Sequence, residues 1–396
     1  MSMIDSTHYF DWAATSPFDT EILKASLETQ FECWGNPSSI YKTGTQAKKA
    51  LDEARERIAK VFDVKAETLF FTSGGTESDH IPLLSILNRP EKGTILVSSI
   101  EHPALREQCA VLSHLGYNVV KINPDRKGII TSKAVTDLMT DDTLYITVMA
   151  VNNETGAINN VSEIAQAVKD KAGTKRKPKF HVDFVQGLGK IPFDLKNTQI
   201  DSAAFSAHKI GGPRGIGLLY IQNPQSTEPF LKGGGQEKGI RSGTENVFGA
   251  SAFASCIEKY SVSKKNEQMY ERYELQKKYI NDFIRKLSEI KSCHIIPEER
   301  LDPSFNDENF SPWVIQAAFD KIPGQVMVRA LDSKGFYIST GSACSAKKNS
   351  RPILEAMNVN PQLRENAVRF SFGALTTEKA IGELIEAVKE VTGKFN

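Results

Sequence analysis

An alternation of short apolar runs with segments of helical period constrains the fold of this chain most strongly. Seven runs rich in β-branched and aromatic residues predict strands, and residues 45–61 place apolar side chains on one face of a helix. Strands that alternate with helices usually pair in parallel, so the pattern predicts an α/β fold with a mainly parallel sheet covered by helices. The predicted strands are residues 68–72, 94–98, 118–122, 144–151, 179–184, 202–205 and 217–221.

A second unit is expected after a long, charged helical segment at residues 263–289. Beyond this segment, residues 313–319 and 368–372 predict strands, and residues 378–388 predict a helix. The large α/β domain is therefore expected to occupy residues 16–255.

The charge balance excludes several classes of partner. The 396 residues contain 49 Lys and Arg against 48 Asp and Glu, so no net charge suited to nucleic acid or an anionic membrane is present. No apolar run approaches the ~18 residues that span a bilayer. The first residues, MSMIDSTHYFDW, lack the pattern of a signal peptide. We therefore expect a cytoplasmic protein with no nucleic-acid or membrane partner.

The five cysteines are odd in number and scattered, which predicts free thiols and no metal site. Cys344 lies in STGSACSAKKNSR, residues 339–351, among small and polar residues that cannot pack a core. A thiol in this setting is either incidental or a reagent. The other four lie in segments of helical or strand character, where a buried, inert thiol is the common case: Cys33, Cys109, Cys256 and Cys293.

The segment FTSGGTES, residues 71–78, places two glycines between a predicted strand and a helix that begins at Thr76. Backbone N–H groups at such a helix start bind anions, phosphate in particular. Most Ser-Gly-Gly loops are simple turns, and the sequence contains neither a Walker motif nor a G-x-G-x-x-G motif. The segment alone is therefore a weak indication of a phosphate site.

Two charged residues follow other predicted strands. Lys209, in SAHKIGGPRGIG, is either a surface lysine at a strand end or a nucleophilic lysine that forms a Schiff base. Asp183, in HVDFVQ, is either a turn or helix cap or a buried carboxylate that keeps a pyridine ring protonated. Gln186, three residues on, would reach an adjacent ring oxygen.

His102 in IEHP and Asn153 in VNNETG also follow predicted strands. A lone histidine is more often structural than catalytic. In a parallel α/β sheet, however, the carboxyl ends of the strands gather at one edge, where ligands bind. Five motifs at matching positions therefore predict a single site at that edge.

Together these motifs resemble those of the cysteine desulfurases, pyridoxal-phosphate enzymes of the class V aminotransferase fold. The likeness runs over nearly the whole chain. It implies a fold type I architecture, in which residues 16–255 form the large cofactor-binding domain with a mainly parallel sheet. Residues 1–15 with 256–396 would form a smaller α+β domain that carries the catalytic cysteine loop. In chain order the motifs are YFDWAATSP, NPSS, FTSGGTES, EHP, VNNETG, HVDFVQ, SAHKIGGPRGIG, GGGQEKGIRSGTEN, STGSACS and VRFSFG.

Carried over position by position, the resemblance implies a role for each group. Lys209 would bind pyridoxal phosphate as a Schiff base, His102 would stack on its ring and move protons, and Cys344 would be the nucleophile. Arg369, backed by Asn36, would hold the substrate carboxylate. The remaining cofactor contacts would be Asp183 at the pyridine nitrogen, Gln186 and Asn153 at the ring oxygen, Gly75, Thr76, Ser206 and His208 at the phosphate, and Thr244 from a second subunit.

The implied reaction removes sulfur from L-cysteine. The thiolate of Cys344 would attack the substrate sulfur and keep it as a persulfide, and alanine would depart. Gly341 and the polar residues 347–350 fit a loop that swings between substrate and acceptor, and Lys347 and Lys348 would lower the pKa of the thiol. The implied partners are L-cysteine, a sulfur-acceptor protein for iron–sulfur cluster, thio-cofactor or tRNA assembly, and a second copy of the chain.

Five positions depart from the family pattern. Trp12 stands where a smaller or different residue is usual, and Phe184 and Gly187 stand where alanines are common. Asp79 and His80 follow TES where asparagines are usual. Phe184 is expected to reshape the pocket beside the cofactor. The sequence ends soon after its last predicted helix, so we expect no longer tail of the kind that some relatives use to dock a scaffold protein.

Two alternatives remain open at this point. One keeps the cofactor but changes the reaction to that of a selenocysteine lyase or another class V lyase or aminotransferase. The GSAC motif argues against a plain transaminase, which has no use for a thiol, but does not exclude selenocysteine as substrate. The other alternative is a non-catalytic scaffold, which the joint presence of Lys209, Asp183, His102 and Cys344 argues against.

Overall fold

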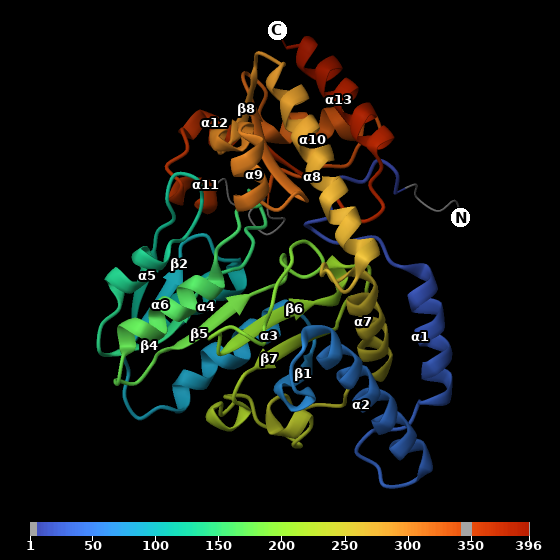
Figure 1. Ribbon diagram of the computed structural model, residues 1–396, viewed down its shortest axis with the longest axis vertical. Helices are drawn as coiled ribbons and strands as arrows, with labels where there is room; N and C mark the ends of the chain where they lie inside the picture. Colours follow the sequence, from blue (N-terminus) through green and yellow to red (C-terminus); the bar gives the residue numbers. More distant parts are fainter. Residues whose placement is uncertain (1–5, 342–350, 396) are drawn as a thin grey trace.

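Two sheets organise the structure, a computed structural model that describes residues 6–341 and 351–395 (Figure 1). The larger sheet has the strand order β1-β7-β6-β5-β4-β2-β3. Neighbours from β6 to β3 pair in parallel, whereas β7 runs antiparallel to both β6 and β1. This arrangement confirms the predicted mainly parallel sheet. Its strands are β1 (Leu69–Thr72), β2 (Thr94–Ser98), β3 (Asn118–Ile122), β4 (Thr143–Thr147), β5 (Lys179–Asp183), β6 (Ser202–Ser206) and β7 (Gly217–Ile221).

All seven strands lie where the apolar runs predict them, and only one differs from its predicted bounds by more than one residue. The predicted strand at residues 144–151 ends at Thr147. Beyond Thr147 the backbone leaves the regular ladder, although the N–H of Ala150 still donates to the carbonyl of Asp183 at 2.9 Å. The chain here turns over the end of β5, and the apolar residues continue because this turn is buried too.

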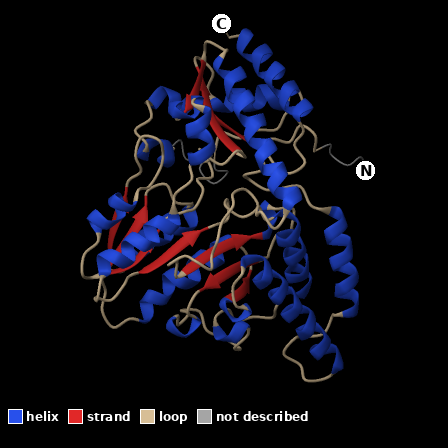
Figure 2. Cartoon of the chain, viewed as in Figure 1, coloured by secondary structure: helices blue, strands red, loops and turns tan. Residues whose placement is uncertain are grey.

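Helices cover both faces of the larger sheet (Figure 2). In β2, Leu96 packs with α2, α6 and α7 on one face, whereas Ile95 and Val97 pack with α3 and α4 on the other. This alternation follows from the two-residue period of a strand. The helices of this part are α1 (Thr20–Glu32), α2 (Lys42–Phe62), α3 (Gly75–Leu84), α4 (Pro103–His114), α5 (Ser132–Leu138), α6 (Val161–Ala172) and α7 (Val247–Tyr260).

The smaller sheet, at the top of Figure 1, is antiparallel with the order β10-β9-β8. Its core also contains Phe10 of the N-terminal segment, whose N–H donates to the carbonyl of Tyr337 at 2.8 Å. The strand β8 was not predicted from the sequence. The elements are α8 (Glu267–Ser288), β8 (Cys293–Ile296), α9 (Pro303–Asn309), β9 (Val314–Phe319), α10 (Gly324–Asp332), α11 (Pro352–Ala356), α12 (Pro361–Asn366), β10 (Ala367–Ser371) and α13 (Glu378–Gly393).

This packing is compatible with the expected division into residues 16–255 and residues 1–15 with 256–396, and that division stays a prediction. Within the two described ranges, no helix is both long enough and apolar enough to cross a membrane.

Phe184 and Gly187, two of the departures from the family pattern, form one packing unit. The ring of Phe184 is buried against Phe193 and Phe205, with ring centroids 4.6 and 5.7 Å away. A Cβ atom on Gly187 would lie 2.4 Å from Cε1 of Phe184. The larger side chain at residue 184 is therefore accommodated by the absence of one at residue 187.

This packing predicts the stability of two variants. Gly187→Ala should lower the free energy of unfolding by about 1–3 kcal/mol, because the buried ring of Phe184 must shift. In the double variant Phe184→Ala/Gly187→Ala the added methyl group has room, so Gly187→Ala should no longer lower the free energy of unfolding. The changes in this free energy caused by the two single substitutions should therefore not be additive. Urea unfolding of the four proteins measures this coupling.

Gly382→Ala is the matched control, because a Cβ atom there meets nothing within 4 Å in the middle of α13. It should leave stability unchanged or raise it by up to about 1 kcal/mol. Strictly additive effects at residues 184 and 187 would contradict the proposed packing.

Candidate active site

A cavity of about 250 Å³ lies at the carboxyl ends of the parallel strands. It brings together most of the site residues that the sequence predicts. Asn36 and Thr244 do not line it and are exposed, and Cys344, Lys347 and Lys348 lie outside the described residues. The predicted residues that line the cavity are Gly75, Thr76, His102, Asn153, Asp183, Gln186, Ser206, His208, Lys209 and Arg369.

One end of the cavity has the donors that a phosphate group requires. The helix α3 begins there at Gly75, and its N-cap residue supplies no side-chain hydrogen bond to its first N–H groups. Ser206 ends β6 beside this helix start. Burial and the nearby Lys209 lower the pKa of His208 to about 3, so its imidazole is neutral at pH 7. A helix start with hydroxyl groups around it is a typical anion site.

Asp183 ends β5 at the floor of the cavity and is almost fully buried. Its Oδ1 accepts a hydrogen bond from the N–H of Val185 at 2.9 Å. Burial, with a contribution from Asp79, raises the pKa of the Asp183 carboxyl to about 7. A cation placed against this carboxyl would favour its ionised form.

The two amides predicted at the ring oxygen differ in their surroundings. Asn153 Oδ1 is buried and has no hydrogen-bond partner among the described residues. The side chain of Gln186 is already engaged, since its Nε2 donates to the carbonyl of Ala13 at 2.9 Å and its Oε1 accepts from Lys190. Of these two side chains, Asn153 is the better placed to bind a ligand.

Lys209 and His102 border the cavity from different elements. Lys209 Nζ donates to the carbonyls of Ala13 and Ala14, both at 2.7 Å. His102 is the N-cap of α4, where its Nδ1 accepts from the N–H of Ala104 at 3.2 Å. Burial and Lys209 lower the pKa of His102 to about 4, so the ring is neutral and carries its proton on Nε2.

Arg369, on β10, closes the cavity from the smaller sheet and is only 1% exposed. Its Nη2 pairs with Asp11 Oδ1 at 2.6 Å, and its Nη1 donates to the carbonyl of Asn153 at 2.9 Å. The role of Asp11 was not predicted from the sequence, although the residue stands in the YFDWAATSP motif. Asp79, noted above only as a departure from the family pattern, also lines the cavity.

Phe184, expected to reshape this pocket, does not line it. Successive side chains of a strand point to opposite faces, so Phe184 faces away from Asp183 and lines a separate cavity of about 500 Å³ instead. The expectation for Phe184 is therefore wrong.

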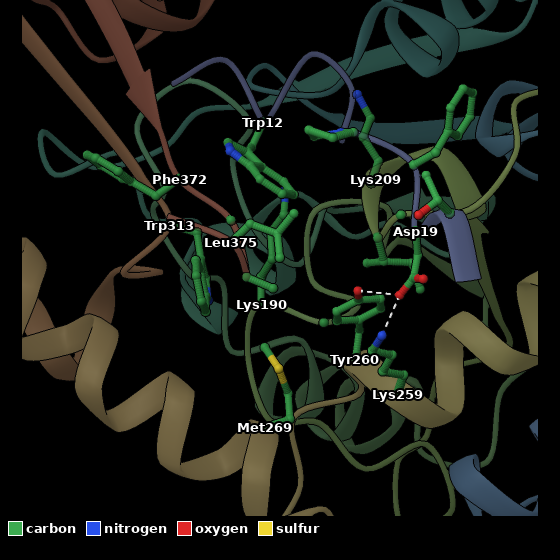
Figure 3. A pocket seen from close by; sticks show the side chains of 18 of the residues that line it. Trp12, Asp19, Lys190, Lys209, Lys259, Tyr260, Met269, Trp313, Phe372 and Leu375 are labelled. Carbon is green, nitrogen blue, oxygen red and sulfur yellow. Dashed lines mark hydrogen bonds and ion pairs between the residues drawn. The ribbon is translucent and has the colours of Figure 1, made fainter. Parts of the chain in front are cut away.

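A second cavity, of about 270 Å³, lies on the other side of Lys209 (Figure 3). Trp12 lines it, and its ring lies so close to Gly373 that a Cβ atom there would be 2.0 Å from Trp12 Cε3. On the opposite wall, Asp19 accepts hydrogen bonds from Lys259 at 2.6 Å and Tyr260 at 2.7 Å. Trp12 is therefore part of the wall behind Lys209.

The first cavity fits pyridoxal phosphate group by group. The start of α3 suits the phosphate, Lys209 is an amine that can bind the aldehyde, and Asp183 suits a protonated ring nitrogen. The carboxamide oxygen of Asn153, which has no partner among the described residues, is available to a polar group of the ligand. No group of three or more His, Cys, Asp or Glu side chains suits a metal ion in residues 6–341 and 351–395.

The raised pKa of Asp183 predicts how the stability of the cofactor-free protein depends on pH. The carboxyl ionises near pH 3.8 when unfolded and at about pH 7 when folded. Between these values the folded state binds one more proton, so this group lowers the free energy of unfolding as pH rises, by about 1.4 kcal/mol per pH unit. Asp183→Asn should therefore be more stable than the wild type at pH 8 and similar near pH 4.

Urea unfolding at several pH values between 4 and 8 measures the difference. If the free energies of unfolding of the wild type and Asp183→Asn change in parallel with pH over this range, Asp183 is not a buried, protonated carboxyl.

A family model described as Aminotransferase class-V matches residues 8–384 of the chain. The cysteine desulfurase IscS of Dictyoglomus turgidum is 32% identical over 390 residues, which cover 98% of this chain and 95% of that protein. The cysteine desulfurase NifS of Azotobacter vinelandii is 34% identical over 392 residues, which cover 98% of this chain and 93% of that protein.

Two solved structures are similar as well. One, described as a NIFS-like protein, has a TM-score of 0.87 and 32% identity, and the match covers 97% of this chain and 99% of that one. Another, described as SspA in complex with cysteine, has a TM-score of 0.78 and 26% identity, and the match covers 94% of this chain and all of that one. The chain belongs to the class V aminotransferase family of pyridoxal-phosphate-dependent enzymes.

Proposed function

We infer that the protein is a cysteine desulfurase, which removes sulfur from L-cysteine and leaves L-alanine. The observation that carries this inference is a single cavity with an amine, a buried carboxyl and a phosphate-type helix start, closed by the oriented guanidinium of Arg369. Relatives at 32–34% identity are named cysteine desulfurases, and one similar structure is described as a complex with cysteine.

Each lining residue is assigned a role in the reaction from its place in the cavity. Pyridoxal phosphate, when bound, withdraws electrons from the α-carbon of the amino acid. Arg369 would bind the substrate carboxylate through its guanidinium, and Lys209 Nζ would hold the cofactor and move the α-proton. His102, neutral with its proton on Nε2, would lie over the ring, where this N–H can donate a hydrogen bond. The low pKa of His102 keeps it from adding a second positive charge beside Lys209.

Cys344 would attack the substrate sulfur as a thiolate, so that a sulfur–sulfur bond forms as the carbon–sulfur bond breaks. The persulfide would then pass its outer sulfur to an acceptor protein. Flanking residues support this role, because the backbones of Ser339 and Arg369 exchange hydrogen bonds at 3.2 and 2.6 Å. Three residues of chain span no more than about 11 Å, so Cys344 can lie no farther than that from Gly341, which is two residues after Ser339.

Sulfide and alanine release from L-cysteine, with a reductant present, tests this function. The wild type should release both in equal amounts, and Cys344→Ala should release neither while it keeps the absorption band of the bound cofactor. Lys209→Ala is the complementary variant and should lose that band. If Cys344→Ala keeps the wild-type rate, the protein is another class V enzyme, and turnover of selenocysteine by that variant would identify a selenocysteine lyase.

The protein is also proposed to be a homodimer in which Thr244 completes the site of the neighbouring subunit. Thr244 and Asn36, the two predicted residues that do not line the cavity, are both exposed. Large apolar side chains near them are exposed as well, a pattern that marks surfaces covered by a partner. These side chains are Trp34, Ile40 and Tyr41 near Asn36, and Phe230 and Leu231 ahead of Thr244.

Mixed dimers test this arrangement. Lys209→Ala and Thr244→Asp should each be nearly inactive alone. If Thr244 serves the neighbour, unfolding and refolding the two variants together should restore roughly one quarter of the wild-type sites, since half of the dimers are mixed and each has one intact site. No recovery, or an active monomer in sedimentation, would contradict the proposal.

A further inference from the structure

An additional buried acid faces the cofactor cavity. Asp79, on α3, is 1% exposed and lines the same cavity as Asp183. The resemblance led us to expect an asparagine here, whereas this protein has a carboxyl group. The roles assigned above leave Asp79 without a function.

A chain of hydrogen bonds holds Asp79 in place. His181 Nε2 lies 3.0 Å from Asp79 Oδ1, and His181 Nδ1 lies 2.8 Å from Ser202 Oγ. His181 is fully buried, and its ring stacks on Tyr145 with the centroids 6.1 Å apart. These hydrogen bonds therefore connect α3 to β5 and β6 inside the protein.

The two-residue period of β5 places the hydrogen bonds of His181 on the same side of the cavity as Asp183, the proposed partner of the pyridine ring nitrogen. His181 and Asp183 are two residues apart in the strand, so their side chains lie on the same face. Asp79 lies over that face from α3. Two carboxyl groups, Asp79 and Asp183, are thus placed on the same side of one cavity.

His181 does not neutralise this pair. Burial lowers the pKa of His181 to about 4, so its imidazole is neutral at pH 7. Burial also raises the pKa of Asp79 well above its usual value, and the charge of Asp79 contributes to the raised pKa of Asp183. Two buried carboxyls next to a neutral histidine favour a ligand that brings a positive charge.

We propose that Asp79, held by His181, is a positioning residue that acts with Asp183 as a second carboxyl group to keep the ring nitrogen of bound pyridoxal phosphate protonated. This proposal rests on cofactor binding and is independent of the sulfur chemistry. Asp183 remains the direct partner of the ring nitrogen. A cationic ring nitrogen would favour the ionised form of both carboxyls, and the charge of Asp79 would then add to the negative potential there and raise the affinity of that nitrogen for its proton.

Other ionisable groups face the same region and must be kept constant in a test. Replacing Asp79 by the isosteric asparagine removes the charge, while Oδ1 can still accept a hydrogen bond from His181. The groups that stay unchanged are Glu101 between β2 and α4, Tyr145 on β4, His181 and Asp183 on β5, His102 at the start of α4, and His208 and Lys209 after β6.

The experiment uses the holoenzyme loaded with pyridoxal phosphate labelled with ¹⁵N at the ring nitrogen. The ¹⁵N chemical shift reports directly whether this nitrogen is protonated, without any turnover. Spectra between pH 6 and 10 are compared for wild type, Asp79→Asn and Asp79→Ser. In both variants the ring nitrogen should lose its proton at a pH about one unit lower than in the wild type, a ten-fold loss of proton affinity.

Ser202→Ala is the matched control, because it breaks the hydrogen bond to His181 Nδ1 without changing any charge. In this variant the ring nitrogen should lose its proton at the same pH as in the wild type. Wild-type titration in Asp79→Asn, or an equal shift in Ser202→Ala, would overturn the proposal. So would a failure of both Asp79 variants to bind the cofactor, since the proposed effect is confined to the ring nitrogen. A wild-type protein that binds cofactor but does not release sulfide would refute the proposed function alone.

Discussion

The site depends on the hydrogen bonds of one N-terminal segment, residues 10–14. The N–H of Ala13 donates to Ser371 Oγ of the smaller sheet at 2.9 Å. The carbonyl of the same residue accepts from Lys209 Nζ at 2.7 Å and from Gln186 Nε2 at 2.9 Å. Buried backbone groups must keep their partners, so the smaller sheet cannot shift without disturbing Lys209 and Gln186, which are proposed to hold the cofactor. The N-terminal segment therefore determines the distance between the two walls of the cavity.

The ion pair between Arg369 and Asp11 also fixes the N-terminal segment against the smaller sheet. A buried guanidinium that loses its partner destabilises a protein by about 3–5 kcal/mol, and Asp11, in the N-terminal segment, is the carboxylate that pairs with it. The carbonyl of Asn153 fixes a second nitrogen of the guanidinium. Arg369 is thus oriented before any substrate enters. Its hydrogen bond to Asn153, which follows β4, also joins the smaller sheet to the part of the chain that forms the larger one.

The sequence predicted those parts of the fold and site that local patterns determine. The seven strands and the residues that follow them could be located because burial on both faces leaves a continuous apolar run. The direction of β7 has no such local signal. Nor do the roles of Asp11 and Asp79, because their partners Arg369 and His181 lie 358 and 102 residues away. The expectation for Phe184 failed for a simpler reason, since the alternation along the strand turns it away from the cavity.

Burial gives the cavity a fixed polarity. His102 and His208 have pKa values of about 4 and 3, so neither is charged at pH 7. Among the lining residues that the structure describes, this leaves Lys209 and Arg369 as the cations, with the acids Asp79 and Asp183 on the side of the sheet. A ligand with a positive ring nitrogen and a negative carboxylate can satisfy both sides in one orientation only. Because the histidines stay neutral, they do not cancel this polarity, and a positive ring nitrogen would itself favour the ionised forms of Asp183 and Asp79.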